Sequence, residues 1–354
     1  ILLQHPAINS VICGYGEEPL KALLSLLSGR DIYKPEGLYF KEDLERADYP
    51  WNTFAEQNIP EALPRNLLPV NRYASVMAKG LSTTIITSKG CPHQCVFCKI
   101  TSDKYWAYST DFVLKEFRAI KNMGIREVEI YDDTFTTSKE RVREICNLLI
   151  KERMGIEWHI RDRITNSDPE LLALMKKAGL RRVNYGIEAA DNETLSRIKN
   201  GITVEQTRKA IRHGKSVGLV TGGYFKIGLP GDTEKEFRKI LDFSIDLGVD
   251  YANYSAVIPY PGTELYSDTM KKGIFKEDVW AEYVRNPRKD FLIPLYTEKY
   301  DRDFLTAFVS HCNKRFYFRP SRILKEFTLV SSFSQLSRKI KTAIAMIMPT
   351  KKNT

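Results

Sequence analysis

Between about Ser82 and Gly262 the sequence alternates short β-rich runs with helix-like segments, and this alternation restricts the possible folds more than any other feature. Such a pattern is typical of parallel strands joined by helices. The expected strands are Thr83–Thr87, Glu127–Tyr131, Glu157–Arg161, Arg182–Ile187, Val220–Ile227 and Tyr251–Ile258. Six consecutive repeats favour an α/β fold built on a partial (β/α)6 TIM-type barrel over a doubly wound sheet. Chemistry is then expected at the carboxyl ends of the strands.

The segments between these strands carry start and stop signals of helices. The expected helices are Asp111–Asn122, Lys139–Arg153, Pro169–Lys177, Val204–Val217 and Glu234–Leu247. Ser138, Asp168 and Thr233 stand where N-caps are needed. Four glycines follow helices at the position that favours a left-handed backbone, namely Gly124, Gly179, Gly218 and Gly248. These signals agree with the repeat pattern.

Outside the repeats the chain divides into three further segments. Residues 1–30 predict a strand (Ser10–Cys13) and a helix (Pro19–Leu27). They form one βα unit with no partner in this chain, which looks like a remnant of a domain. Residues 31–81 contain five prolines and predict a linker. We therefore expect a remnant over 1–30, a linker over 31–81, the barrel over 82–270 and a helical C-terminal extension over 271–354. Because no initiator Met is present, we expect the chain to begin inside a larger protein.

The composition is that of a folded protein, with 43% hydrophobic and 28% charged residues. It excludes disordered and disulfide-scaffold classes, and no apolar run approaches the ~20 residues of a membrane span. The net charge of +10 is concentrated in residues 311–354, where ten Lys and Arg face one acid, Glu326. Six cysteines, only three of them clustered, favour a reducing, cytoplasmic compartment and a metal site.

The clustered cysteines form the sequence Cys91-Pro-His-Gln-Cys95-Val-Phe-Cys98, just after the first barrel strand. Three thiolates at this spacing can hold three irons of a 4Fe–4S cluster and leave the fourth open to another ligand. A zinc site with His93 as the fourth ligand is the alternative, although zinc sites usually use two pairs of Cys. The motif and its position favour the cluster.

The sequence resembles the radical S-adenosylmethionine (SAM) enzymes, whose signature is Cys-x3-Cys-x2-Cys with an aromatic residue before the last Cys. Further stretches resemble the subgroup with an N-terminal cobalamin-binding domain, which includes relatives of anaerobic magnesium-protoporphyrin ester cyclase: Tyr131–Phe135, Gly186–Glu188, Lys226–Thr233 and Pro259–Thr263. The resemblance implies that SAM chelates the open iron. Reductive cleavage then gives a 5′-deoxyadenosyl radical that abstracts hydrogen from an unactivated carbon.

Several residues at strand ends are candidates for binding SAM. The resemblance implies a ligand-facing role for Asp132 or Asp133, with helix capping as the alternative, and for Glu188, with an ion pair to Arg161 or Arg163 as the alternative. Phe97 is expected to pack over the cluster. Gly222 and Gly228 are expected to allow close approach of the backbone to adenine and ribose.

The resemblance also implies partners and an outcome. Cobalamin-dependent C-methylation is the expected reaction of the full-length protein, with oxidative cyclisation of a porphyrin-like or lipidic substrate, or a nonenzymatic iron–sulfur protein, as alternatives. The same resemblance implies that residues 1–30 are the C-terminal remnant of a Rossmann-like cobalamin-binding domain. The cobalt-ligating His loop is missing, so this chain alone is not expected to hold cobalamin. We expect a small-molecule substrate, a reductant such as flavodoxin or ferredoxin, and no nucleic acid.

The C-terminal tail combines basic charge with helical apolar periodicity. Leu336, Ile340, Ile344 and Ile347 share one face beside basic residues. This pattern is typical of a helix on an anionic membrane surface. The alternatives are a basic helix packed on the barrel and a nucleic-acid-binding patch.

Overall fold

The computed structural model describes residues 2–14, 16–30, 33–45, 63–70, 78, 80–99, 105–330 and 333–347. The chain divides into two compact units, Ile1–Ile59 with Tyr266–Pro294, and Pro60–Leu265 with Leu295–Thr354. The second unit contains the predicted barrel. Most of the predicted linker, and the side chain of Ile347, lie outside the described residues.

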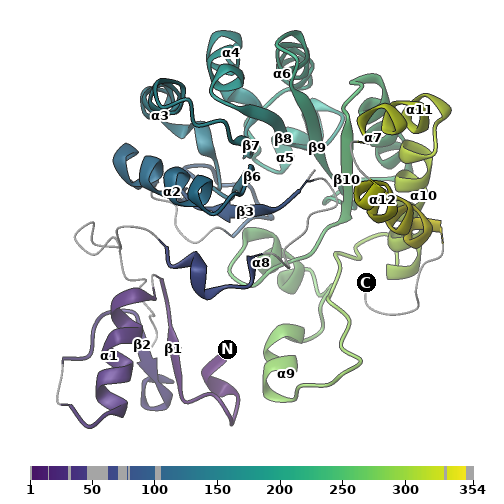
Figure 1. Ribbon diagram of the computed structural model, residues 1–354. Coiled ribbons are helices and arrows are strands. Elements are labelled where there is room, and N and C mark those ends of the chain that lie inside the picture. The colour runs from purple at the N-terminus through teal and green to yellow at the C-terminus, as the bar shows by residue number, and fades with distance from the viewer. Residues whose placement is uncertain are drawn as a thin grey trace. The chain divides into compact units, whose positions relative to one another are not determined.

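A curled six-stranded sheet forms the centre of the second unit (Figure 1). Its order is β10-β9-β8-β7-β6-β3, and every neighbouring pair is parallel. The bounds are β3 (Ser82–Ile85), β6 (Glu127–Ile130), β7 (Glu157–Asp162), β8 (Leu180–Glu188), β9 (Val220–Ile227) and β10 (Tyr251–Ala256). The expected α/β class and partial barrel are confirmed, and each strand lies within a few residues of its predicted bounds.

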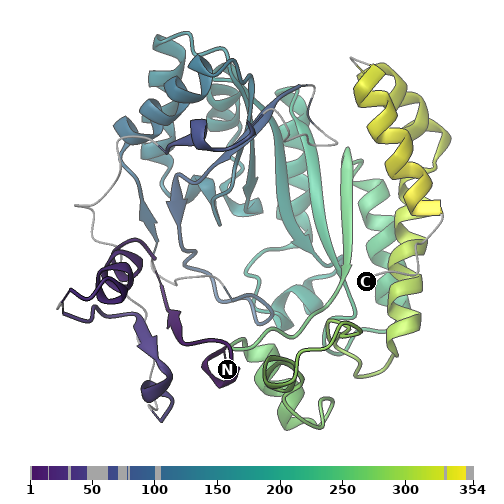
Figure 2. The same ribbon diagram turned by 60° about the horizontal axis from the view of Figure 1, so that its bottom comes forward.

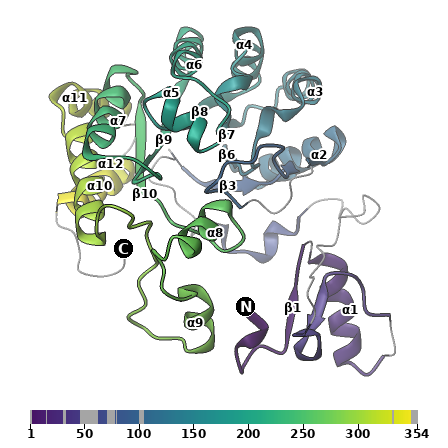
Figure 3. The ribbon, with the colours of Figure 1, turned by 180° about the vertical axis from the view of Figure 1, so that it is seen from behind.

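Helices cover the convex face of the sheet (Figure 1). They are α2 (Thr110–Asn122), α3 (Lys139–Lys151), α4 (Pro169–Lys177), α6 (Val204–Ser216) and α7 (Glu234–Asp246). The short helix α5 (Asn192–Arg197), which follows β8 and is visible in Figure 3, was not predicted, because its six residues are too few to show a helical period.

The predicted caps explain where these helices begin and end. The Ser138 hydroxyl accepts the Arg141 N–H at 3.3 Å, and the Asp168 carboxylate accepts the Leu171 N–H at 3.0 Å. At Thr233 the direction differs, since its own N–H donates to the Glu236 carboxylate at 3.1 Å. All four predicted stop glycines have a positive φ, between 62° and 117°.

The two faces of the sheet differ in chemistry. In β8, Val183, Tyr185 and Ile187 are fully buried against the helices. The alternate positions carry Arg182, Asn184, Gly186 and Glu188, and the side chains of Arg182 and Asn184 lie on the concave side. A closed barrel usually fills its interior with Val, Ile and Leu. Here the concave face is polar, and the apolar core lies between the sheet and its outer helices.

Three C-terminal helices lie beside β10 (Figure 2), namely α10 (Arg302–Tyr317), α11 (Pro320–Leu329) and α12 (Phe333–Ile347). The Tyr317 hydroxyl accepts the Ala252 N–H at 3.2 Å and donates to the Ala252 carbonyl at 2.8 Å, which fixes α10 to the sheet. Within the residues that the structure describes, no helix combines the length and apolar character needed to cross a bilayer.

The remaining elements are short. In the first unit, β1 (Ser10–Ile12) pairs antiparallel with β2 (Leu38–Phe40), so the N-terminal βα unit does have a partner, contrary to our expectation. That partner lies in the segment predicted as a linker. The other elements are α1 (Glu17–Leu27), the hairpin β4 (Ser88–Lys89) with β5 (Trp106–Ala107), α8 (Glu264–Lys271), α9 (Val279–Arg285), and the 3-10 turns Leu2–Gln4, Lys41–Asp43, Arg65–Leu67, Phe135–Thr137 and Ile164–Asn166.

Candidate functional site

The cysteine loop follows β4 at the carboxyl end of the sheet and is fixed by backbone hydrogen bonds. The Val96 N–H donates to the Ile198 carbonyl at 3.1 Å, and the Val96 carbonyl accepts the Leu265 N–H at 2.9 Å. Inside the loop, the Cys98 N–H donates to the Cys95 carbonyl at 3.0 Å. The loop is therefore held by the segments that follow α5 and β10.

Asp132 and Asp133 support this loop in different ways. Asp132 is buried, and its carboxylate accepts from the Thr87 N–H (2.6 Å), the Thr87 hydroxyl (2.5 Å) and the Ser88 hydroxyl (2.6 Å). Asp133 is exposed and accepts the Gly90 N–H at 2.8 Å. Asp132 is thus hydrogen-bonded to the segment that leads to Cys91. Asp133 makes one hydrogen bond to that segment, and its exposed carboxylate stays accessible.

Neighbouring acidic groups disfavour ionisation of Cys98. Burial, together with the nearby Cys95, Cys91, Asp133 and Glu188, raises the pKa of Cys98 to about 11. Burial also raises the pKa of Cys95, while Arg163 lowers it. Thiolates held together in this way are stabilised by a cationic iron centre, so the donor set fits an iron–sulfur cluster. The described residues nevertheless show no group of three or more His, Cys, Asp or Glu already in a metal-binding arrangement.

Glu188 ends β8 in a strained and buried position. Its φ of 66° is in the left-handed region that a residue with a side chain rarely adopts, and 8% of the residue is exposed. Burial raises the pKa of its carboxyl to about 7, although Lys226 and Arg163 lower it. Its Oε2 atom has no hydrogen-bond partner. A buried acceptor in this state fits a donor group supplied by a ligand.

The alternative considered for Glu188, an ion pair with Arg161 or Arg163, is not present in the structure. The Arg161 guanidinium lies 3.8 Å from the centre of the Tyr131 ring, and the Arg163 guanidinium donates to Asn200. This geometry leaves the Glu188 Oε2 atom for a ligand.

Lys226 belongs to the site and was missed as a functional residue. Its Nζ lies 5.6 Å from the centre of the Phe97 ring and 3.2 Å from the Ser255 hydroxyl. The structure thus brings Phe97 next to a cation near Glu188. The sequence did contain a signal for Lys226, because a charged residue near the end of an otherwise buried strand indicates a functional position.

The two candidate glycines lie in different surroundings. Gly222 is in the first half of β9, where an added Cβ would overlap the Asn184 side-chain oxygen of the neighbouring strand. Gly228 follows β9 with a φ of 84°, and an added Cβ would lie 3.1 Å from Leu305 of α10. Gly222 therefore faces the concave side, whereas Gly228 is required by its backbone and by packing.

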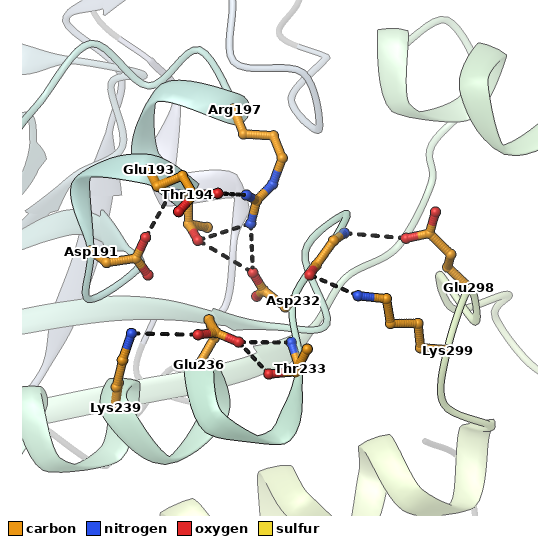
Figure 4. Close-up of polar contacts among 11 residues, drawn as sticks. Asp191, Glu193, Thr194, Arg197, Asp232, Thr233, Glu236, Lys239, Glu298 and Lys299 are labelled. Atoms are coloured by element: carbon orange, nitrogen blue, oxygen red, sulfur yellow. Dashed lines mark hydrogen bonds and ion pairs between the residues drawn. The ribbon is translucent and has the colours of Figure 1, made fainter.

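A polar network fixes the turn after β9 (Figure 4). The Arg197 guanidinium donates to Asp232 at 3.0 Å and to the Thr194 hydroxyl at 2.9 Å. Lys299 donates to the Gly231 carbonyl at 2.9 Å. Burial raises the pKa of Asp232 to about 7, against the opposing effect of Arg197. The cavity beside this network has a volume of about 10 Å³, which is room for only one water. The network therefore holds the turn, and the cavity is too small for a larger ligand.

A large cavity of about 780 Å³ occupies the concave face. A hydrogen-bonded pair and an ion pair lie in its wall: His159 Nε2 lies 2.8 Å from Glu127, and Arg182 donates to Glu129 at 2.7 Å. Its lining also includes Asn184, Gly222, Tyr131, Tyr224 and Tyr251. The wall contains hydrogen-bonding groups and aromatic rings, which suit a polar organic ligand.

Comparison with known protein families matches residues 85–244 to the Radical SAM superfamily. An uncharacterized methyltransferase of Pyrococcus horikoshii is 32% identical over 329 residues, covering 91% of this chain and 70% of that protein. The anaerobic magnesium-protoporphyrin IX monomethyl ester cyclase of Rubrivivax gelatinosus is 24% identical, covering 93% of this chain and 60% of that protein.

Two solved structures share the fold. The radical SAM methyltransferase TsrM from Kitasatospora setae, with cobalamin and a 4Fe–4S cluster bound, gives a TM-score of 0.63 at 20% identity, covering 75% of this chain and 54% of that chain. The cobalamin-dependent radical SAM enzyme OxsB, with aqua-cobalamin and SAM bound, gives a TM-score of 0.66 at 15% identity, covering 96% of this chain and 55% of that chain. The chain thus spans about half the length of these two proteins.

Proposed function

The chain belongs to the Radical SAM superfamily, and from this premise we propose that Cys91, Cys95 and Cys98 bind a 4Fe–4S cluster. One observation carries the proposal: a loop with three closely spaced thiols lies near a buried carboxylate, that of Glu188, which has an unpaired oxygen. When bound, the cluster supplies the electron that cleaves SAM reductively. An electron carrier alone would not require the second feature.

The chain's own residues are assigned roles around this centre. Glu188 accepts a hydrogen bond from the amino group of SAM, which satisfies its Oε2 atom. Asp133, exposed beside the loop, is a second acceptor for that amino group. Phe97 packs beside the cofactor, with Lys226 near its ring. Asp132 holds the loop through Thr87 and acts as a positioning residue.

The cavity of the concave face, whose described lining does not include the cysteine loop or Glu188, is proposed as the substrate pocket. Glu127, His159 and Arg182 are all buried in or beside its wall. An apolar ligand would remove water from these groups and would offer no hydrogen bonds in place of those that the water made, which is unfavourable. The pocket therefore suits the polar part of a small-molecule substrate. Gly222 keeps the wall open beside Asn184.

The proposed overall reaction is cobalamin-dependent C-methylation. The relative from Pyrococcus is named a methyltransferase, and TsrM and OxsB have cobalamin bound. Oxidative cyclisation is the second candidate, favoured by the cyclase from Rubrivivax. We propose that residues 1–30 are the end of a cobalamin-binding domain and that this chain alone binds cobalamin weakly, while a longer version binds it tightly.

The proposal extends to two partners. A reductant such as flavodoxin or ferredoxin supplies electrons. Residues 311–354 are proposed to contact anionic membranes: Ile340 and Ile344 are each 50% exposed and Phe333 is 86% exposed. Not all of the basic charge is available, since Arg338 donates to the Ala78 carbonyl at 2.9 Å and Lys339 to Glu326 at 2.6 Å.

Anaerobic reconstitution with iron and sulfide tests the cluster. We expect about four iron and four sulfide per chain, and loss of most of the iron in Cys95→Ala. Cys146→Ala is the matched control, because Cys146 is buried in α3 and outside the loop. Stoichiometric zinc in anaerobic preparations, or equal iron in both variants, would contradict the assignment.

The reaction itself is tested with reduced protein and SAM. We expect 5′-deoxyadenosine to form slowly without substrate. Glu188→Gln should weaken SAM binding while the iron content stays unchanged, because Glu188 is proposed to bind the ligand and not the metal. Normal SAM affinity in this variant would remove Glu188 from the binding site. Transfer of a labelled methyl group to the product would separate methylation from cyclisation.

A further inference from the structure

Arg163 directly follows β7, and its guanidinium reaches the cysteine loop. Its Nη1 atom lies 4.0 Å from the Sγ atom of Cys95. The hydroxyl of Thr134, which follows β6, lies 3.6 Å from Cys91 Sγ. Arg163 is thus a permanently charged donor placed beside one of the thiols proposed to bind iron.

The position of Arg163 is fixed by its surroundings. Its Nη2 atom donates to the Asn200 carbonyl and, at 3.2 Å, to the Asn200 side-chain oxygen. Its own backbone N–H donates to Asp162 at 2.8 Å. Asn200 is buried, and the nearby Ile198 carbonyl accepts the Val96 N–H. One segment therefore holds both the guanidinium and the loop, and the charge cannot turn away from Cys95.

The two arginines near the end of β7 differ in their surroundings. The Arg163 guanidinium reaches Cys95 Sγ, at 4.0 Å from Nη1. The Arg161 guanidinium instead lies 3.8 Å from the centre of the Tyr131 ring. Of these two charges, Arg163 is therefore the one placed beside the cysteine loop.

We infer that Arg163 raises the reduction potential of the 4Fe–4S cluster by placing a fixed positive charge and an N–H donor beside Cys95. Reduction adds one negative charge to the cluster. A nearby cation and hydrogen bonds to the ligating sulfur stabilise the reduced form more than the oxidised form. Arg163 is thereby a positioning and tuning residue, and the inference rests on the proposed ligation by Cys95.

The inference differs from a role of Arg163 in binding the carboxylate of SAM. That role would change the affinity for SAM and leave the potential of the SAM-free cluster unchanged. The measurement is therefore made without SAM, by a redox titration of the reconstituted full chain followed by electron paramagnetic resonance.

Three variants define the test. In Arg163→Met the midpoint potential should become more negative, with iron and sulfide contents equal to wild type. Arg163→Lys keeps the charge and loses the planar donor, so its midpoint potential should lie between those of Arg163→Met and the wild type. Arg161→Met is the matched control: its guanidinium covers the Tyr131 ring at 3.8 Å, and its potential should equal that of the wild type.

Each outcome decides the question. Unchanged potential in Arg163→Met with an intact cluster would overturn the inference, as would an equal shift in Arg161→Met. If Arg163→Met cannot hold a cluster, Arg163→Lys decides, and failure of both to assemble one would show a structural role instead. Failure of the wild-type chain to bind iron would overturn the proposed function before this question arises.

Discussion

Replacing Glu188 by Gln should stabilise the metal-free chain at pH 8, although it removes a residue of the candidate site. The carboxyl is buried at the end of β8, and burial raises its pKa from the ordinary 4.5 to about 7. At pH 8 the wild-type protein must therefore keep a charged group in a poorly solvated position. Gln has nearly the same shape and no charge, so the variant avoids this cost.

The magnitude and sign follow from the two pKa values. The folded chain keeps the proton between pH 4.5 and about 7, where the unfolded chain has lost it, so stability falls as the pH rises through this window. The difference of about 2.5 units, at roughly 1.4 kcal/mol per unit, corresponds to about 3 kcal/mol above pH 7. Glu188→Gln should therefore gain up to about 3 kcal/mol at pH 8 and much less at pH 5.

Urea unfolding followed by tryptophan fluorescence measures this gain, because Trp158 is buried in the strand next to β8. Glu193→Gln is the control, since its carboxylate is 90% exposed in the ion pair with Arg197 and should contribute little. An equal or lower stability of Glu188→Gln at pH 8, or a difference that does not change with pH, would refute the reasoning.

Three further predictions concern other parts of the fold. Asp132→Asn should lower the free energy of unfolding by about 2–3 kcal/mol, since three hydrogen bonds to a buried carboxylate are disturbed, and should reduce iron uptake; normal values of both would show that Asp132 does not hold the loop. Gly179→Ala should lower the free energy of unfolding by about 2 kcal/mol, because φ is 117° and a Cβ would overlap the Ile156 carbonyl. Gly124 has a φ of 76° and open space around it, so Gly124→Ala should lower the free energy of unfolding by only about 1 kcal/mol. Thermal unfolding measures both losses. Deleting residues 334–354 should release the chain from acidic liposomes in a sedimentation assay at low salt, and added salt should weaken binding of the intact chain; an intact chain that stays in the supernatant would favour a tail packed only on the barrel.

The repeat pattern predicted the sheet well because each strand alternates with a helix that has its own cap and stop signals. β9 was predicted with its observed bounds, Val220–Ile227, and α4 with Pro169–Lys177. The N-terminal segment was harder. Three-residue strands such as β1 and β2 carry too little periodicity, so their pairing depends on contacts between distant residues that a local pattern does not contain.

The sequence identified the residue types of the candidate site better than their individual surroundings. The spacing of Cys91, Cys95 and Cys98 placed three thiols in one loop. It could not separate Asp132, which accepts three hydrogen bonds, from the exposed Asp133, because their partners Thr87, Ser88 and Gly90 lie 43 to 45 residues away in the sequence. Arg163 was considered only as a partner of Glu188, since the path of its side chain to Asn200 depends on the loop after α5.

The polar concave face explains why a partial barrel suits this chain. β3 and β10 are the two edges of the sheet and do not pair with each other, so the interior is not sealed as in a closed barrel. In a closed barrel, buried charges such as those of Glu127, Glu129 and Arg182 would have to replace their hydration within the packed interior. The opening leaves a cavity of about 780 Å³ beside these groups. Stability then comes from the apolar layer under the outer helices, and the concave face can carry the charged residues that ligand binding requires.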